Sequence, residues 1–406
     1  MWDQKNILLI CPTYDEKSNG ILVFYSLSDN FTKLGFNVHH YPVDKNLFES
    51  NKKKYPLRYI NKFVEEFDLS CNQTLCILPD SIPFELSKQL NFKWRLWYFL
   101  NKPSFLTNEP LHYMENDIFV SYSKLLSKND YQLFLNYKIP ELNNIIEKID
   151  NNQIQKKHQI AIYWGKSRQR GICLLFILKF LSFGCFKIVP INRKYPAEKD
   201  KLYQILSESK LLVSFDPLTN LVYESNLCRT PCVIADNYMD VNYKEYNIDL
   251  LGITDKLSNI YSLYRNGINQ KSWEKMINQY HLTSQNHVGA VQCLVGFIND
   301  EFERLSGLSQ FEKQRRIDAI SNNHFTEYHN YKKQLCKVNY DFANFSPILS
   351  LKTYVKLAII FNLRLIFNLI SKLLLVDTGF VYQINRLFEA EMANICNNYF
   401  QYESSR

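Results

Sequence analysis

The chain has 406 residues, of which 46% are hydrophobic and only 11 are glycine, and it carries a formal net charge of +8. This length allows two or three domains with substantial cores, and the scarcity of glycine argues against a glycine-rich phosphate loop. The sequence has no basic block and no RNA-binding aromatic motif, which disfavours nucleic acid as a partner.

The ten cysteines are scattered, with no CxxC pair and no Cys/His group at zinc-binding spacing. Several lie in apolar runs, where a free thiol behaves as a small hydrophobic side chain. No secretory signal is recognisable at the start of the chain. These features predict a reducing, cytoplasmic location and no bound metal ion.

The first half of the chain alternates apolar runs with amphipathic stretches. Strands are expected at 5–11, 37–43, 74–78, 117–121 and 131–137, and helices at 20–34 and 56–68. Gly35 is expected to end the first helix. This alternation predicts a parallel sheet, which binds ligands at the carboxyl ends of its strands. Tyr14, Asp15 and Glu16 follow the first strand and are candidate binding residues.

A polar stretch, 141–157, is expected to separate a first domain from a second one in which the same alternation restarts. Strands are expected at 159–163, 186–191, 211–215 and 250–254, with helices at 172–182, 196–209, 256–266 and 271–304, the last one broken near His281. Gly165, Lys166 and Arg168 follow the first of these strands. A glycine lets the backbone approach a ligand, and the two cations could hold a diphosphate or a carboxylate. The alternative is a solvated basic loop.

The segment 210–236 reads as strand, tight turn, helix and strand. Asp216 is expected to cap the helix, with Pro217 at its first position, where a missing N–H costs nothing. The free N–H groups and the positive dipole end of this helix suit a phosphate, and Thr219 and Asn220 add side-chain donors. Glu224 lies just over one turn further on, within reach of a ribose. The alternative is an ordinary buried α/β unit that binds no ligand.

The spacing of Glu224, Pro231 and Val233–Ile234–Ala235 resembles the Glu-(x)6-Pro-x-Val-Ile-Ala signature of nucleotide-sugar glycosyltransferases of the GT-B fold. In that superfamily the glutamate usually binds the nucleotide ribose. The resemblance implies an α/β architecture of two Rossmann-like domains that face a cleft. Residues 1–150 would form the acceptor side and 151–345 the donor side. Arg229 stands where the superfamily often has glycine.

The segment 163–236 and the overall length more narrowly resemble the retaining bacterial β-Kdo transferase modules of enzymes that assemble O-antigen polysaccharides. This resemblance implies a CMP-β-Kdo donor, a polysaccharide acceptor that receives Kdo at its non-reducing end, no metal or other cofactor, and further domains of a longer polypeptide. The donor-binding residues would be Gly165, Lys166, Arg168, Ser214, Thr219, Asn220 and Glu224. Tyr14, Asp15 and Glu16 would lie on the acceptor side.

In that family, retention resembles a double displacement by an enzyme carboxylate. The matching position here is Cys232, directly after Pro231. A thiolate could attack the anomeric carbon, but a thioglycoside is a poor substrate for the second displacement, so the chain would trap a covalent sugar. The alternative is that Cys232 is simply a buried strand residue. The acid/base partner stays open among His39, His40, His281, His287, Asp15 and Glu16.

Residues 349–376 are the most hydrophobic segment, but Lys356, Arg364 and Lys372 interrupt it, which disfavours a transmembrane span. We expect helices within 346–406 that pack across both domains. The alternative is a basic amphipathic helix at the inner face of the membrane. Two other functions stay open: a CMP-sugar transferase similar to sialyltransferases, and a non-catalytic GT-B module that binds polysaccharide.

Overall fold

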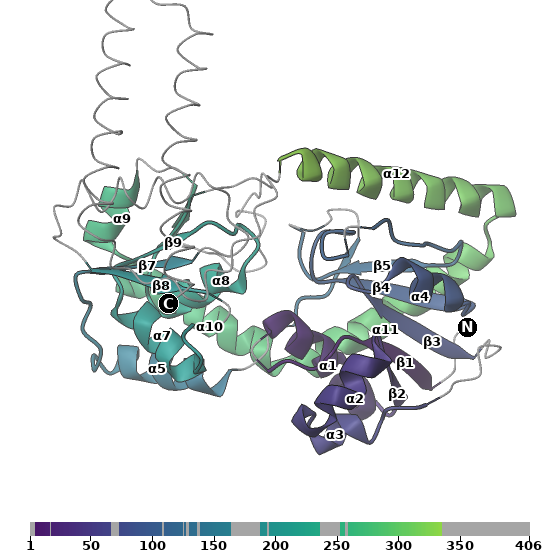
Figure 1. The fold of residues 1–406 in the computed structure, drawn as a ribbon, viewed down its shortest axis with the longest axis horizontal. Coiled ribbons are helices and arrows are strands. Elements are labelled where there is room, and N and C mark those ends of the chain that lie inside the picture. Colours follow the sequence, from purple (N-terminus) through teal and green to yellow (C-terminus); the bar gives the residue numbers. More distant parts are fainter. Residues whose placement is uncertain are drawn as a thin grey trace, which may run out of the picture. The chain divides into compact units, whose positions relative to one another are not determined.

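The computed structural model describes residues 5–334, apart from 17, 66–72, 108, 125, 127–129, 136–138, 164–186, 193–194, 236–251 and 256–258. The described chain forms two compact units (Figure 1). Unit 1 takes in Met1–Ile139 and Glu274–Gln334, and unit 2 takes in Pro140–Val241 and Leu251–Trp273. The basic loop with Gly165, Lys166 and Arg168 and the helices expected within 346–406 lie outside the described residues.

These units differ from the ranges expected from the sequence at two places. Helix α5 (Pro140–Asp150) belongs to unit 2, because its apolar side chains pack toward helix α7 (Lys199–Glu208). The chain also returns to unit 1 from Glu274 onward, because helix α11 (His287–Ser306) contributes to the core of unit 1. Residues 274–334 are therefore part of the first unit rather than of the donor-side domain.

Unit 1 is built on a parallel sheet with the strand order β2-β1-β3-β4-β5-β6. The strands are β1 (Asn6–Cys11), β2 (Asn37–Pro42), β3 (Thr74–Pro79), β4 (Trp94–Phe99), β5 (Ile118–Ser121) and β6 (Tyr131–Gln132). Five of them lie where the sequence predicts strands. The sequence predicts no element for the aromatic run that forms β4, because this run has neither a helical nor a strict strand period.

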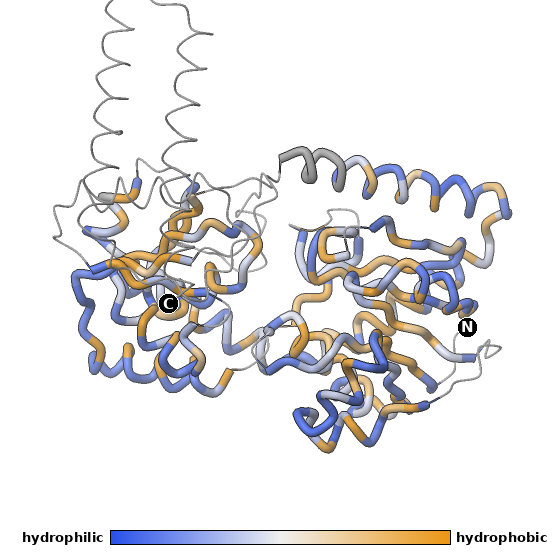
Figure 2. Tube along the Cα trace, viewed as in Figure 1, coloured by the Kyte–Doolittle hydropathy of each residue, from blue (hydrophilic) through white to orange (hydrophobic). Residues whose placement is uncertain are grey.

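Both faces of this sheet are covered, and β1 shows how. Ile7, Leu9 and Cys11 enter one apolar cluster, whereas Leu8 and Ile10 enter another, as the two-residue period of a strand requires. Helices α1 (Asn19–Lys33) and α11 contribute to the first cluster, and α12 (Gln310–Gln334) contributes Ile317 to the second. Figure 2 shows apolar residues concentrated along the strands. No helix in the described part of the chain is long and apolar enough to cross a membrane.

Several helix boundaries in unit 1 differ from the expectations. Of the helix expected at 56–68, the described residues up to 65 form only α3 (Leu57–Ile60), because the chain then bridges the β2 residue His40 through Phe63. Helix α10 (Gln270–Gln285) ends before Asn286, so the break expected near His281 lies five residues later. The sequence does not predict helix α12. It also does not predict three short helical elements: α2 (Lys45–Asn51), η1 (Lys52–Lys54) and α4 (Phe84–Gln89).

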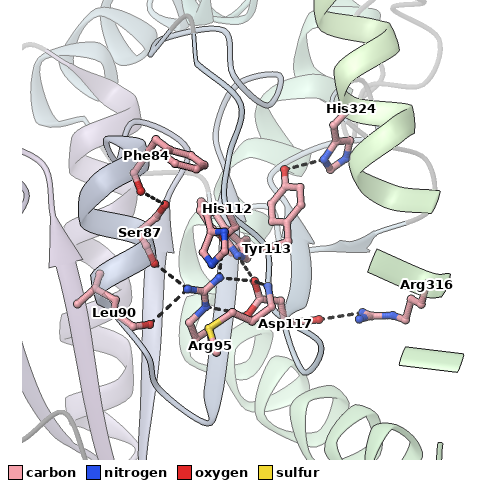
Figure 3. Close-up of polar contacts among 11 residues, drawn as sticks. Phe84, Ser87, Leu90, Arg95, His112, Tyr113, Asp117, Arg316 and His324 are labelled. Carbon is pink, nitrogen blue, oxygen red and sulfur yellow. Dashed lines mark hydrogen bonds and ion pairs between the residues drawn. The ribbon is translucent and has the colours of Figure 1, made fainter. Parts of the chain in front are cut away.

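A buried ion pair ties β4 to the start of β5 (Figure 3). The guanidinium of Arg95 donates from Nε to Asp117 Oδ1 at 2.8 Å and from Nη2 to Asp117 Oδ2 at 2.6 Å. Arg316 of α12 donates from Nη2 to the backbone oxygen of Asp117 at 2.9 Å. The hydroxyl of Tyr113 lies 2.7 Å from Nδ1 of His324, also on α12. This network therefore joins the sheet to the last described helix.

Unit 2 is a second parallel sheet, with the order β11-β10-β9-β7-β8. Its strands are β7 (Gln159–Tyr163), β8 (Lys187–Ile191), β9 (Leu211–Ser214), β10 (Cys232–Ile234) and β11 (Ile253–Thr254). Helices α5, α7, α8 (Asn220–Leu227) and α9 (Ile260–Asn266) also belong to it. The α/β class expected from the sequence is confirmed, and each of the two units is a Rossmann-like parallel sheet with helices.

Candidate functional site

The strand order of unit 2 singles out one place on its sheet. The order of the strands reverses between β7 and β9, since β8 follows β7 in the chain but lies on the opposite side from β9. In open α/β sheets, ligands bind beyond the carboxyl ends of the two strands at such a switch point. Tyr163 and Ser214 are the last residues of these strands and are direct neighbours in the register. A ligand is therefore expected beyond these two residues.

The turn after β9 is built by side chains that hydrogen-bond to the backbone. Ser214 Oγ donates to the backbone oxygen of Asp216 at 2.9 Å and accepts from its N–H at 3.2 Å. Asp216 Oδ1 accepts from the N–H of Leu218 at 3.1 Å. These bonds hold the carboxyl end of β9 in a fixed shape, and they give the Ser214 hydroxyl a structural role.

Helix α8 begins later than the sequence predicts. Its N-cap is Thr219, whose Oγ1 accepts from the N–H of Leu221 at 3.3 Å, and Asn220 is the first helical residue. The expected cap at Asp216 with Pro217 at the first position is wrong, because the Asp216 carboxylate is bonded to Leu218 and forms an Asx turn ahead of the helix. The helix start still offers N–H groups at the carboxyl edge of the sheet.

Two buried carboxylates lie on either side of this helix start. Asp216 is 5% exposed and Glu224 is 4% exposed, and the side chains of α8 from Leu221 to Leu227 are all buried. A carboxylate is rarely buried in an apolar helix unless it has a specific role or partner. Sequence reasoning selected Glu224 but gave Asp216 only a capping role. The signal that could have identified Asp216 is its place directly beyond the central strand of the sheet.

The end of α8 resolves the question raised by Arg229. The N–H of Arg229 bonds to Asn226 O at 2.9 Å and that of Thr230 to Ser225 O at 2.8 Å, which is the Schellman pattern. Arg229 has φ of +55°, the left-handed conformation that glycine usually provides. Its Nε donates to Ile268 O at 3.1 Å. The helix is thus capped normally although the glycine is missing.

Cys232 lies inside the sheet. It is the first residue of β10, it neighbours Leu212 and Ile253 in the register, and it has no exposed surface. Burial raises the pKa of its thiol well above the usual range. The thiol is therefore protonated, whereas a nucleophilic cysteine needs a thiolate in a partly exposed site. This environment fits the alternative interpretation of Cys232, a buried strand residue.

The candidate residues of unit 1 also follow a strand at a switch point, since β1 lies between β2 and β3. The backbone N–H of Tyr14 donates to the hydroxyl of Tyr55 at 3.1 Å, and the Tyr14 ring lies edge-on to Tyr25 with centroids 5.4 Å apart. Asp15 and Glu16 are exposed. The loop after β1 therefore combines a fixed aromatic residue with two solvent-facing carboxylates.

The four histidines considered as acid/base partners all belong to unit 1. His40 is fully buried, its Nε2 lies 2.8 Å from Ser28 Oγ, and burial lowers its pKa to about 3. A neutral histidine in the core is not placed for proton exchange with a substrate. His39, His281 and His287 are half-buried. The acid/base assignment among these three, Asp15 and Glu16 stays a prediction.

Within the ranges that the structure describes, no group of three or more His, Cys, Asp or Glu side chains is placed to hold a metal ion. No protein-family model matches the sequence, and no curated protein matches it.

Solved structures similar to this chain include two glycosyltransferases. One comes from Rickettsia africae, with a TM-score of 0.41 and 13% identity, covering 76% of this chain and 100% of that one. The other is AviGT4, a glycosyltransferase involved in avilamycin A biosynthesis, with a TM-score of 0.39 and 10% identity, covering 75% of this chain and 99% of that one. At scores this low, the fold assignment rests on the two parallel sheets of the chain itself.

Proposed function

We propose that this protein is a glycosyltransferase that binds a nucleotide-sugar donor at the carboxyl ends of β7 and β9. The observation that carries the proposal is Glu224, a buried carboxylate on the helix that begins beside this switch point. The signature formed by Glu224, Pro231 and the residues of β10 folds as helix, turn and strand, all within unit 2. A nucleotide fits such a site, because its ribose hydroxyls pair with a carboxylate and its phosphate with helix N–H groups.

The proposal assigns the following roles. The Glu224 carboxylate accepts hydrogen bonds from the ribose hydroxyls, and the start of α8 at Asn220 receives the phosphate. Lys166 and Arg168, which follow β7 in the chain, add positive charge. Such cations and the helix dipole stabilise the phosphate as it leaves, so the transfer needs no metal ion in this scheme. Tyr14, Asp15 and Glu16 are proposed to contact the acceptor.

The finer form of the proposal names CMP-β-Kdo as donor and a polysaccharide as acceptor, with retention of the anomeric configuration. It is supported by the resemblance to retaining β-Kdo transferase modules. The chemistry of the donor is compatible, since CMP-Kdo carries a phosphate and a carboxylate and the loop after β7 carries two cations. We leave Cys232 out of the proposed mechanism, because its thiol is buried and protonated.

Nucleotide-dependent stabilisation tests the donor site. CMP, UDP and GDP are each added in excess to the whole protein, and the melting temperature is followed. A nucleotide at about 100 times its Kd adds about 2.7 kcal/mol to the free energy of unfolding. We expect a rise with CMP that is largely lost in Glu224→Gln. The control is Glu198→Gln, an exposed glutamate of the same unit, which should keep the full rise.

The pattern of results separates the alternatives. A rise in melting temperature with UDP or GDP but not with CMP would still support a glycosyltransferase, but one whose donor is not a CMP-sugar. No rise with any nucleotide would favour a non-catalytic module that binds polysaccharide. Incubation with CMP-Kdo followed by intact-protein mass measurement then tests for a covalent sugar. An adduct that disappears in Cys232→Ser would show that the thiol is accessible and would reverse our exclusion of Cys232.

A further inference from the structure

One exposed segment of unit 1 combines a net positive charge with exposed leucine side chains. It is formed by the consecutive elements α2, η1 and α3, which lie between β2 and the bridge at Phe63. We call residues 44–58 the α2–α3 surface. Figure 2 shows the hydrophilic colouring of this segment interrupted by apolar positions. The proposed reaction uses none of the charged or leucine side chains of this segment; only the buried Tyr55 hydroxyl, which accepts from the N–H of Tyr14, touches a proposed acceptor residue.

The α2–α3 surface is held firmly in place by aromatic side chains on its inner side. Phe48 and Tyr55 of this segment, and Tyr59 directly after it, are buried in the apolar cluster between the sheet and its helices. The rings of Phe48 and Tyr55 lie 5.2 Å apart, edge to face. Tyr59 also donates from its hydroxyl to Asp29 Oδ2 at 2.8 Å. The residues between these anchors are therefore forced outward.

The outward side chains carry a net positive charge. Five cations lie in the segment against two carboxylates, giving a net charge of +3: Lys45, Lys52, Lys53, Lys54 and Arg58 against Asp44 and Glu49. All seven side chains are exposed. Lys52 and Arg58 each have a carboxylate at 3.6 Å, in Glu49 and Asp29. Lys45, Lys53 and Lys54 therefore carry the positive charge that remains for a partner.

Two leucines project from the same segment. Leu57 is 77% exposed and stands between Lys54 and Arg58 in the sequence, and Leu47 is 50% exposed on the first turn of α2. Hydrogen bonds link the first turn of α2 to η1: Asn51 Nδ2 donates to Leu47 O at 2.9 Å, and Lys54 Nζ donates to Asn51 Oδ1 at 2.8 Å. An exposed leucine side chain is unfavourable in water. Its free energy is lowered where it can enter an apolar layer while the neighbouring lysines contact an anionic layer above it.

We propose that the α2–α3 surface binds an anionic lipid bilayer. The lysines would meet the lipid headgroups while Leu57, and to a lesser extent Leu47, enters the boundary of the acyl chains, as in interfacial segments of peripheral proteins. Each lysine near such a surface is worth about 1 kcal/mol, or about fivefold in binding. A soluble polyanion would use the lysines but would gain nothing from the leucines, so the exposed leucines favour a membrane.

Binding of the full-length protein to vesicles tests this. Vesicles of phosphatidylcholine with phosphatidylglycerol are compared with pure phosphatidylcholine by flotation. Lys53→Glu/Lys54→Glu should lower binding by at least 25-fold, from two lost cations at about fivefold each. Leu57→Ser should lower it by about tenfold. The matched controls are Lys148→Glu/Lys187→Glu and Leu282→Ser, exposed residues elsewhere in the chain that should change binding little.

Three results would overturn the proposal. The first is that the unaltered protein does not bind anionic vesicles at low salt. The second is that both α2–α3 variants bind as well as their controls, which would place membrane contact elsewhere. The third is that the lysine variant loses binding while Leu57→Ser keeps it and heparin competes fully, which would identify a soluble polyanion as the partner. Melting temperatures equal to that of the unaltered protein would show that the variants remain folded.

Discussion

Replacing Asp117 with asparagine should destabilise unit 1 more than almost any other single isosteric change. The carboxylate of Asp117 accepts four hydrogen bonds: two from Arg95, one from Trp97 Nε1 at 2.6 Å and one from the N–H of Met114 at 2.9 Å. Both members of the ion pair have side-chain exposures of at most 1%. Asparagine keeps the shape, but it removes the charge and turns one acceptor into a donor that faces other donors.

The expected loss of unfolding free energy can be estimated from the Arg95–Asp117 ion pair. Removing one partner of a buried ion pair costs about 3–5 kcal/mol, because an unpaired charge stays buried. Arg95 would keep its bonds to the carbonyl oxygens of Ser87, Leu90 and His112, which soften but do not cancel this cost. Unit 1 has about 200 residues, and at this size 1 kcal/mol corresponds to about 2–4 °C. The transition of unit 1 should therefore fall by roughly 6–20 °C.

Thermal unfolding followed by circular dichroism or calorimetry measures this shift. The control is Glu301→Gln, which breaks the partly exposed pair with Arg304 and should cost at most about 1 kcal/mol. The double variant Arg95→Met/Asp117→Asn removes the unpaired cation and should recover part of the stability. The reasoning would be refuted if Asp117→Asn shifted the transition no more than Glu301→Gln does.

Three further predictions concern backbone strain and buried titratable groups. Arg229→Gly should be more stable than Arg229→Ala by about 1 kcal/mol in urea unfolding, because φ of +55° is strained for alanine; equal midpoints would contradict this. Burial lowers the pKa of His40 to about 3, so between about pH 6.5 and 3 only the unfolded chain binds a proton at this residue. The free energy of unfolding should therefore fall as the pH drops through this range, and His40→Phe should reduce its slope against pH by up to about 1.4 kcal/mol per pH unit. Burial lowers the pKa of Lys156 to about 7, and its Nζ donates a hydrogen bond to Thr230 Oγ1 at 2.5 Å. Between about pH 7 and 10 only the unfolded chain keeps this proton, so the free energy of unfolding should rise with pH over this range, and Lys156→Met should abolish the rise. An unchanged slope in Lys156→Met would show that the ammonium is not buried.

The sequence by itself determined most of the strands and the order of helix, turn and strand in the signature around Glu224. Apolar runs of five or six residues bounded by turns predicted β1, β3 and β7 within a residue or two. Gly35 takes φ of +84° after α1, as its expected capping role requires. These features are local, because the period of apolar residues and the conformations allowed to single residues act over only a few positions.

Only the tertiary structure decided how the strands are ordered and what surrounds each candidate residue. The switch point between β7 and β9 depends on pairing between segments about 50 residues apart, which no local pattern specifies. The burial of Cys232 follows from its neighbours in the sheet, Leu212 and Ile253. Helix α12 is mostly polar, and its place on unit 1 depends on Ile317 and on the contacts of Arg316 and His324. In each case the deciding contact joins residues distant in sequence, so its free energy appears only once the chain has folded.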